Sequence, residues 1–371
     1  MKLAVSEEQR ELRASVRRFL ADRAPVSRVR ELMETDDGID RDVWRQAGAQ
    51  LDLPGIAIGE EYGGGGFSFT EQAIVLEELG AALYGGPYLA SAVLAATALL
   101  SGSDEAARRD LLPGIASGQA VATLAFTEDD GSWEPAAIRL AATRGGDGWV
   151  LDGHKSFVLD GHTADLILVA AAGDAGLSLF AVPAGAAGLD RQPLPTLDQT
   201  RKLARLEFRA VPGRLIGAPG EAAATMARTL DVAAIALAAE QLGGAQRSLD
   251  MAVTYAKARH QFGRAIGSFQ AIKHRCADLL LEIESLRSAV GYAAAAVAED
   301  SPEIPAVAAL TQAYASDVFF HAAAENIQIH GGIGFTWEHD AHLYFKRAKA
   351  SELFLGDATY HRDHLADRIG I

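Results

Sequence analysis

Apolar residues recur at helical spacing in the first third of the chain. Leu12, Val16 and Phe19 share one side of an N-terminal stretch, and Ser6 with Gln9 forms a candidate capping box ahead of it. Two further helices are predicted over residues 70–83 and 90–100. We therefore expect an N-terminal helical domain over residues 1–117.

Short β-rich runs replace the helical pattern near residue 118. They cover residues 122–126, 149–151, 166–170, 177–182 and 206–208. Asp152-Gly153 and Asp160-Gly161 are turn dipeptides between these runs. This pattern predicts a small antiparallel, barrel-like β domain over residues 118–220.

The helical pattern returns from residue 221. Asp231 is a candidate N-cap for a long helix that ends near Ala258, and more helices are predicted over residues 269–298, 305–328 and after 341. We expect a C-terminal four-helix bundle domain over residues 221–371. Because helices and strands are segregated rather than alternating, the expected fold class is α+β multidomain, not a doubly wound sheet.

Composition narrows the function classes. The net charge of −15 argues against a nucleic-acid partner, which requires a basic surface. Cys276 is the single cysteine, so an internal disulfide and a cysteine-based zinc site are excluded, and a reducing cytoplasmic location is expected. Residues 1–25 lack the apolar region of a secretory signal, and we expect no membrane span.

Two weaker patterns have ordinary explanations. The run Gly63–Gly66 lacks the Lys-Ser/Thr pair and the strand–loop–helix context of a phosphate loop, so a flexible loop is expected. The pairs His339/His342 and His361/His364 have i, i+3 spacing, but the sequence offers no evident third metal ligand. Histidines at the surface or in hydrogen bonds are the preferred interpretation.

Two separated segments carry the most specific signal. The first is YAKARHQFGRAIGSFQ, from Tyr255 to Gln270, and the second is QIHGGIGFTWE, from Gln328 to Glu338. Together they closely resemble the two C-terminal signatures of the acyl-CoA dehydrogenases, a family of FAD flavoproteins. The resemblance extends over most of the chain, including the helix–β–helix order and the triplet Phe126-Thr127-Glu128 in the middle domain.

The resemblance implies an FAD held between the middle domain and the C-terminal bundle, with its diphosphate and adenosine contacted by a neighbouring subunit. Arg259 matches the arginine that pairs with the diphosphate, a contact suited to the guanidinium fork. Thr127 matches the residue beside the pyrimidine side of the flavin. The other matched positions are Phe126, Gln261, Phe262, Gln328, Gly331 and Gly332.

Several positions depart from the family pattern. The family's tryptophan and threonine against the flavin fall at Phe157 and Leu159, and only Phe157 can still cover a ring. Leu355 stands where the usual catalytic carboxylate is. Asp357 replaces a threonine and is expected, from the resemblance, to contact the cofactor. The backbone N–H of Leu355 survives the substitution, so its part in binding the substrate thioester carbonyl is expected to persist.

A different base is therefore needed. In part of the family the carboxylate comes from an earlier helix, but Ala233 occupies that position here. Glu240, in an apolar helix, is the remaining candidate catalytic residue, and it lies about 10 Å along the helix from position 233, on the same face. A buried carboxylate must be paired, exposed or protonated. The alternative is a structural glutamate paired with a neighbouring arginine.

Three functions follow from the resemblance. The first is FAD-dependent α,β-dehydrogenation of an acyl-CoA thioester to the 2,3-enoyl-CoA in lipid metabolism, with electrons passed to an electron-transfer flavoprotein. The second is a base-deficient partner subunit in a heterotetramer with a paralogous chain. The third is an acyl-CoA-binding relative without dehydrogenation. The apolar character of residues 232–244 and 305–324 favours a tetramer, either homomeric or heteromeric.

Overall fold

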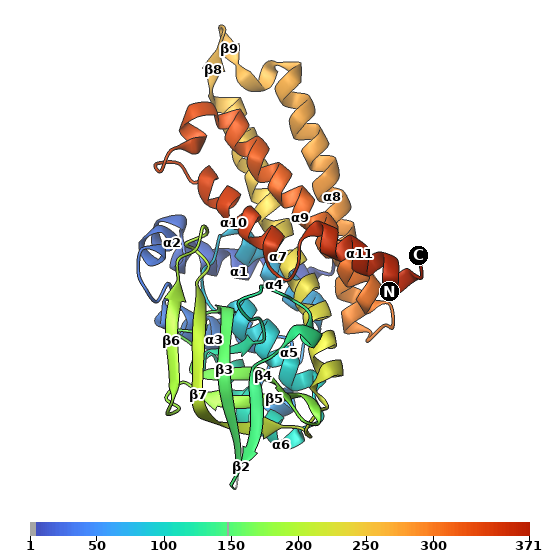
Figure 1. Ribbon diagram of the computed structural model, residues 1–371. Coiled ribbons are helices and arrows are strands. Elements are labelled where there is room, and N and C mark those ends of the chain that lie inside the picture. Colours follow the sequence, from blue (N-terminus) through green and yellow to red (C-terminus); the bar gives the residue numbers. More distant parts are fainter. Residues whose placement is uncertain (1–4, 147) are drawn as a thin grey trace. The chain divides into compact units, whose positions relative to one another are not determined.

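The computed structural model describes residues 5–146 and 148–371 (Figure 1). The chain divides into two compact units. The helical unit comprises residues up to Arg30 together with Phe69–Tyr84 and Ala234–Ile371, and the sheet unit comprises Glu31–Ser68 and Gly85–Ala233. The N-terminal third is thus shared between the two units.

The N-terminal helices begin with α1, whose predicted capping box is confirmed: the Ser6 side chain accepts from the Gln9 backbone and the Gln9 side chain accepts from the Ser6 backbone. Glu78 on α4 anchors α1, because Arg13 and Arg17 both pair with it. The N-terminal helices of the helical unit are α1 (Glu7–Arg23), α2 (Val26–Met33), whose last residues enter the sheet unit, and α4 (Phe69–Ala81).

Long helices form the rest of the helical unit, and α7, α8 and α9 run beside one another with a short hairpin at one end (Figure 1). The prediction that Asp231 caps α7 is wrong. The helix starts nine residues earlier at Ala222, because the alanine-rich segment before Asp231 also favours a helix. The elements are α7 (Ala222–Ala258), β8 (His260–Gln261), β9 (Arg264–Ala265), η5 (Ile266–Ser268), α8 (Gln270–Ala298), α9 (Ile304–His330), η6 (Gly331–Phe335), α10 (Ala341–Leu353) and α11 (Ala358–Ile369).

Helices α4 and α7 approach each other through glycines. A Cβ added at Gly80 would lie 1.9 Å from the carbonyl oxygen of Glu240, and one at Gly243 would lie 1.8 Å from the carbonyl oxygen of Glu77. Only glycine fits at either position, since no real Cβ comes so close to a backbone oxygen. This crossing fixes the part of α7 that carries Glu240.

The sheet unit contains a closed, barrel-like sheet. The strand order is β1-β4-β2-β3-β7-β5, β6 also pairs with β7, and a β4–β5 pairing closes the path. Most pairs are antiparallel, as predicted, but β4 pairs in parallel with β1 and, at one residue pair, with β2. A long crossover that includes the β2–β3 hairpin joins β1 to β4. The strands are β1 (Ala122–Ala125), β2 (Ala141–Gly145), β3 (Gly148–Leu159), β4 (Leu166–Gly173), β5 (Gly176–Pro183), β6 (Leu189–Leu194) and β7 (Leu203–Ile216).

The helices of the sheet unit include a stretch of π-helix, η3, that continues directly into α5. Together they replace the single helix predicted over residues 90–100. The elements are α3 (Arg41–Leu51), η1 (Leu53–Gly55), η2 (Glu60–Tyr62), η3 (Tyr88–Ala95), α5 (Ala96–Ser101), α6 (Glu105–Ala116) and η4 (Pro135–Ala137). The predicted fold class, helical ends around a β-barrel-like middle segment, is confirmed.

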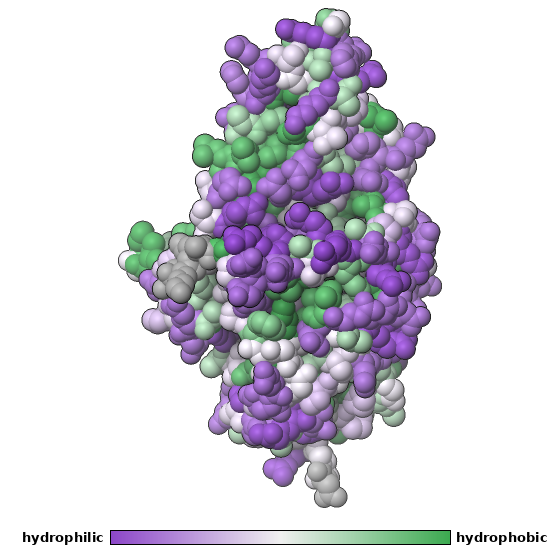
Figure 2. Space-filling view, turned by 180° about the vertical axis from the view of Figure 1, so that it is seen from behind, coloured by the Kyte–Doolittle hydropathy of each residue, from purple (hydrophilic) through white to green (hydrophobic). Residues whose placement is uncertain are grey.

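The long apolar helix α7 lies in the protein core. By length and composition it could cross a membrane, but 67% of its apolar window is buried inside the protein, as in a core helix. Residues 232–244 are all buried within the single chain, so their apolar character does not by itself require another subunit. Apolar patches interrupt the otherwise hydrophilic surface (Figure 2). Leu281 on α8 is 70% exposed.

Candidate functional site

The first signature forms an exposed hairpin between α7 and α8. Strands β8 and β9 pair, and Phe262 and Gly263 at the tip both have positive φ, as a tight turn requires. Phe262 is 90% exposed, and Gln261 is exposed as well. Both backbone polar groups of Arg259 are hydrogen-bonded: its N–H donates to the Tyr255 carbonyl, and its carbonyl accepts from the Ile266 N–H.

The side chain of Arg259 is exposed, and its guanidinium pairs with nothing among the residues that the structure describes. A positioned backbone with an unpaired fork of N–H donors is suited to a diphosphate. Arg264, in contrast, lies over the ring of Phe269, 4.0 Å from its centroid. Arg259 is therefore the cation of this hairpin that remains available for a ligand.

The second signature lies at the end of α9 and is brought to the first by ring stacking. The ring of His330 lies 4.3 Å from that of Tyr255, and Ile329 shares a small core with Ala252 and Ala256 of α7. Burial lowers the pKa of His330, which favours the neutral imidazole in this stack. Two signatures far apart in sequence thus form one continuous surface.

Glycines leave open space beside this stack. Gln328, Gly331 and Gly332 are exposed, and a Cβ added at either glycine would meet no atom within 4 Å. Gly331 also has a φ of +65°, which favours glycine. Glycines that the chain's own packing leaves uncovered fit a segment where a ligand approaches the backbone. With Arg259, they fit the diphosphate of FAD.

The middle-domain residues lie at an irregularity in β3 of the sheet unit. The register with β7 shifts between Lys155 and Val158, and Phe157 within the shift has a φ of +58°. Such a conformation is costly for a side chain of this size and is often found at functional sites. Phe157 is 37% exposed, whereas Leu159 is buried and its carbonyl accepts from Thr123. Phe157 can thus cover a flat ligand, and Leu159 belongs to the core.

Thr127 and Phe126 hold this irregular segment from the end of β1. The hydroxyl of Thr127 is buried and donates to the carbonyl of Ser156, whose N–H donates back to Thr127. Phe126 is buried and packs against Trp133, with ring centroids 5.9 Å apart. The Thr127 hydroxyl donates its single hydrogen bond within the protein, so toward a ligand it can act only as a hydrogen-bond acceptor.

A buried ion pair missed in the sequence supports the same segment. The Lys155 ammonium donates to the Phe126 carbonyl at 3.0 Å and to the Glu128 carboxylate at 2.9 Å. Burial lowers the pKa of Lys155 to about 8, although its pairing with Glu128 opposes that shift. A lysine at an inward-facing position of one strand, with an acidic residue just after another strand, was the available signal.

Leu355 lies in a strained turn between α10 and α11. It is buried with a φ of +64°, and its N–H makes no hydrogen bond within residues 5–146 and 148–371. Burial lowers the pKa of His361, on the helix that follows this turn, to about 4. A free, buried N–H is unusual and fits a role in binding an acceptor such as a thioester carbonyl. The carbonyl would be supplied by the substrate.

Asp357 has a local structural role. Its carboxylate accepts from the Tyr360 N–H at 2.8 Å and caps α11. Aspartate and threonine are both good N-caps, so the cap accounts for Asp357 in place of the family's threonine without a cofactor contact. Its predicted contact with the cofactor stays a prediction.

Glu240 is buried and paired. Its carboxylate accepts from Arg347 on α10 at 2.8 Å, and the two side chains are 10% and 3% exposed. Arg347 compensates the buried charge, as in the alternative considered from the sequence. Ala233 on the same helix is fully buried and offers no carboxylate. A base role for Glu240 would require its carboxylate to leave this partner.

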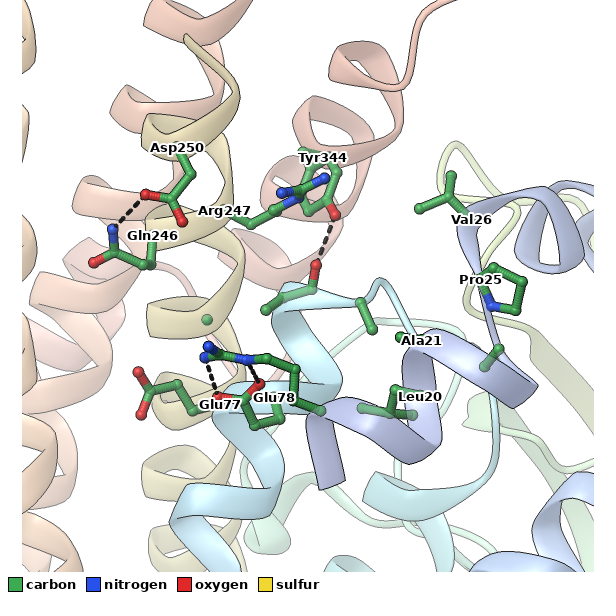
Figure 3. Close-up of a pocket in the computed structure, with 15 residues that line it drawn as sticks. Leu20, Ala21, Pro25, Val26, Glu77, Glu78, Gln246, Arg247, Asp250 and Tyr344 are labelled. Carbon is green, nitrogen blue, oxygen red and sulfur yellow. Dashed lines mark hydrogen bonds and ion pairs between the residues drawn. The ribbon is translucent and has the colours of Figure 1, made fainter. Parts of the chain in front are cut away.

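A cavity of about 370 Å³ in the helical unit lies among other residues (Figure 3). Its polar groups satisfy one another: Arg17 donates twice to Glu78, the Tyr344 hydroxyl donates to the Ala81 carbonyl, and Gln246 donates to Asp250. None of the predicted site residues lines it. The cavity is therefore not the predicted acyl-CoA site.

Comparison with known families matches almost the whole chain. Residues 6–119, 123–211 and 222–370 match the N-terminal, middle and C-terminal domains of acyl-CoA dehydrogenase. The curated relative acyl-CoA dehydrogenase IpdE2 of Mycobacterium tuberculosis is 38% identical over 349 residues, which cover 94% of this chain and 93% of the relative.

Two solved structures have the same fold. A variant of the Tcur3481-Tcur3483 steroid ACAD is 34% identical with a TM-score of 0.89, and coverage is 99% of both chains. The ChsE4-ChsE5 complex from Mycobacterium tuberculosis is 30% identical with a TM-score of 0.90, covering 100% of this chain and 99% of that one. The chain belongs to the acyl-CoA dehydrogenase family of flavin-dependent oxidoreductases.

Proposed function

We propose that the chain is the base-deficient subunit of a two-chain acyl-CoA dehydrogenase. In this proposal it holds part of the FAD, and a paralogous chain supplies the carboxylate that removes the α-proton. One observation carries the proposal: Glu240, the last candidate base, is buried in an ion pair with Arg347. The other two positions where the family carries the carboxylate hold Leu355 and Ala233.

The residues of the helical unit fit the FAD diphosphate. Arg259 would pair with it, the amide of Gln328 would donate to it, and Gly331 and Gly332 would let it approach the backbone. In the sheet unit, Phe157 would cover the flavin ring. Bound flavin supplies the acceptor for the hydride that leaves the β-carbon. The exposure of these residues in the single chain supports a site completed by another subunit.

The names of two relatives support the two-chain form. ChsE4-ChsE5 and Tcur3481-Tcur3483 are each a pair of proteins, and both resemble this chain along its full length. The second is a steroid ACAD, so we extend the proposal to a bulky, ring-bearing acyl-CoA. We further propose an electron-transfer flavoprotein as the electron acceptor, an α2β2 assembly and a cytoplasmic location.

A single-chain enzyme is the second candidate function. The free, buried N–H of Leu355 favours it, since that group fits the thioester carbonyl. Turnover would then require Glu240 to separate from Arg347 when substrate binds. This candidate keeps the α,β-dehydrogenation and changes only the source of the base.

Flavin content tests the proposal. The chain is purified alone and after co-expression with each acyl-CoA dehydrogenase paralogue from the same genome, and the ratio of flavin to protein is measured by absorbance and mass. The proposal expects a flavin-poor, poorly soluble chain alone, and a yellow complex with one paralogue. A yellow homomeric protein that reduces an artificial acceptor with an acyl-CoA would overturn it.

A further inference from the structure

The segment that carries the second signature has little packing of its own. Phe335 is 77% exposed and Trp337 is 61% exposed, so the turns between α9 and α10 bury little apolar surface. Gly334 is an exception, because a Cβ there would lie 2.8 Å from the Cβ of His330. Contacts from outside the segment must therefore supply much of its order.

Arg30 on α2 supplies such contacts from a distant part of the sequence. It donates to the Trp337 carbonyl at 2.9 Å and through Nε to the Asp340 carboxylate at 2.9 Å. Asp340 occupies the N-cap position of α10 but makes no side-chain cap hydrogen bond there. Its carboxylate is used instead to hold Arg30, while the His339 ring accepts from the first N–H of α10.

A second cation, on α10, contacts the same segment. The Lys346 ammonium lies 4.1 Å from the centroid of the Trp337 ring, a cation–π contact. His342 meets the same ring edge-on at 4.9 Å. The backbone and the ring of Trp337 are thus held by different groups, and Arg30 is the one that comes from the N-terminal helices.

We infer that Arg30 is a positioning residue for flavin binding: through the Trp337 carbonyl and Asp340 it holds residues 331–340 in the conformation that receives the diphosphate. This inference rests on the proposed function, which assigns FAD to Gly331 and Gly332. Ordering the segment before the ligand arrives lowers the entropy cost of binding. Loss of Arg30 should therefore weaken flavin binding through its effect on residues 331–340.

The test compares Arg30→Met with Arg45→Met. Arg45 on α3 is a matched control, since it forms a surface ion pair with Asp42 and lies in the sheet unit. Hydrogen exchange is measured on the complex with the paired chain after its flavin has been removed, and flavin release is measured on the same complex loaded with FAD. For Arg30→Met we expect amides of residues 331–340 to exchange about tenfold faster and FAD to be released about tenfold faster.

Unchanged exchange in residues 331–340, or faster exchange with unchanged flavin release, would overturn the inference. Arg30→Lys keeps the charge but not the fork, so it should give an intermediate exchange rate. If Arg30→Met does not fold, Asp340→Asn tests the same contact with a smaller change and should also speed exchange. Arg259→Met separates the two proposals: if it leaves flavin bound, the FAD assignment in the proposed function fails, whereas the exchange result for Arg30 still stands.

Discussion

Replacing Glu240 distinguishes a structural carboxylate from a catalytic base. Glu240→Gln keeps the side-chain shape and removes the charge, so the Arg347 guanidinium, only 3% exposed, loses the charge of the Glu240 carboxylate. Breaking a buried ion pair on one side costs about 3–5 kcal/mol, because the remaining charge stays buried. For a chain of this length that corresponds to a fall in melting temperature of roughly 4–6 °C.

The matched control removes both charges. Glu240→Gln/Arg347→Met removes both charges of this ion pair, so we expect most of the lost stability to return, with a coupling energy of about 2–3 kcal/mol in the double-mutant cycle. The assay is denaturant unfolding of the wild type, Glu240→Gln, Arg347→Met and the double variant, together with turnover per folded complex. Turnover should stay within a few-fold of wild type. A loss of turnover by orders of magnitude in Glu240→Gln, with stability unchanged, would refute this reasoning and establish Glu240 as the base.

Three other changes test separate parts of the structure. Arg259→Met should lower the flavin retained by the assembled protein, and an unchanged flavin spectrum would contradict its assignment. Gly243→Ala should destabilise the fold by about 3 kcal/mol or more through overpacking, whereas Gly291→Ala, which meets no atom within 4 Å, should stabilise slightly; equal melting temperatures would contradict the close approach of α4 and α7. The pKa of Lys155 is lowered from its usual 10.5 to about 8 in the folded protein, so between pH 8 and 10.5 the unfolded state binds more protons than the folded state. The free energy of unfolding should therefore rise with pH across that window, and Lys155→Met should flatten this dependence of unfolding free energy on pH.

Local patterns were enough to predict most helices and the core strands. The capping box at Ser6 and the helices near residues 270–298 and 305–328 depend on nearby side chains, which a sequence displays directly. Strands β2 and β6 were missed because their residues are mostly exposed or half-buried and lack a clear apolar alternation. The domain boundaries after residues 117 and 220 remain a prediction.

Some local patterns gave a wrong prediction because tertiary contacts determine the structure of these segments. Asp152-Gly153 was predicted as a turn, but it lies within β3 at a bulge, where the Asp152 carboxylate accepts from the Ala210 N–H. Gly63–Gly66 was predicted as a flexible loop, yet the N–H groups of Gly64 and Gly66 both donate to backbone carbonyls. The dipeptide and the glycine run were recognised, but the sequence could not show their partners.

Part of the candidate site could also be predicted from the sequence, and part could not. Each of the two signatures is a continuous stretch of sequence, so the sequence was enough to predict Arg259, Gln328 and the glycines after α9. The partners of Glu240 and Asp340 could not, since Arg347 is 107 residues from the first and Arg30 is 310 residues from the second. Only the fold brings such charges together, so whether Glu240 is paired was open until the structure was known.

Turnover by the purified chain alone tests the central claim most directly. The full chain is supplied with excess FAD, an artificial electron acceptor and a series of straight, branched and ring-bearing acyl-CoA thioesters. If it is the base-deficient subunit, acceptor reduction stays at the level of the protein-free blank with every thioester, and turnover arises only when the paired chain is added. Reduction by the chain alone, abolished by Glu240→Gln, would contradict the account.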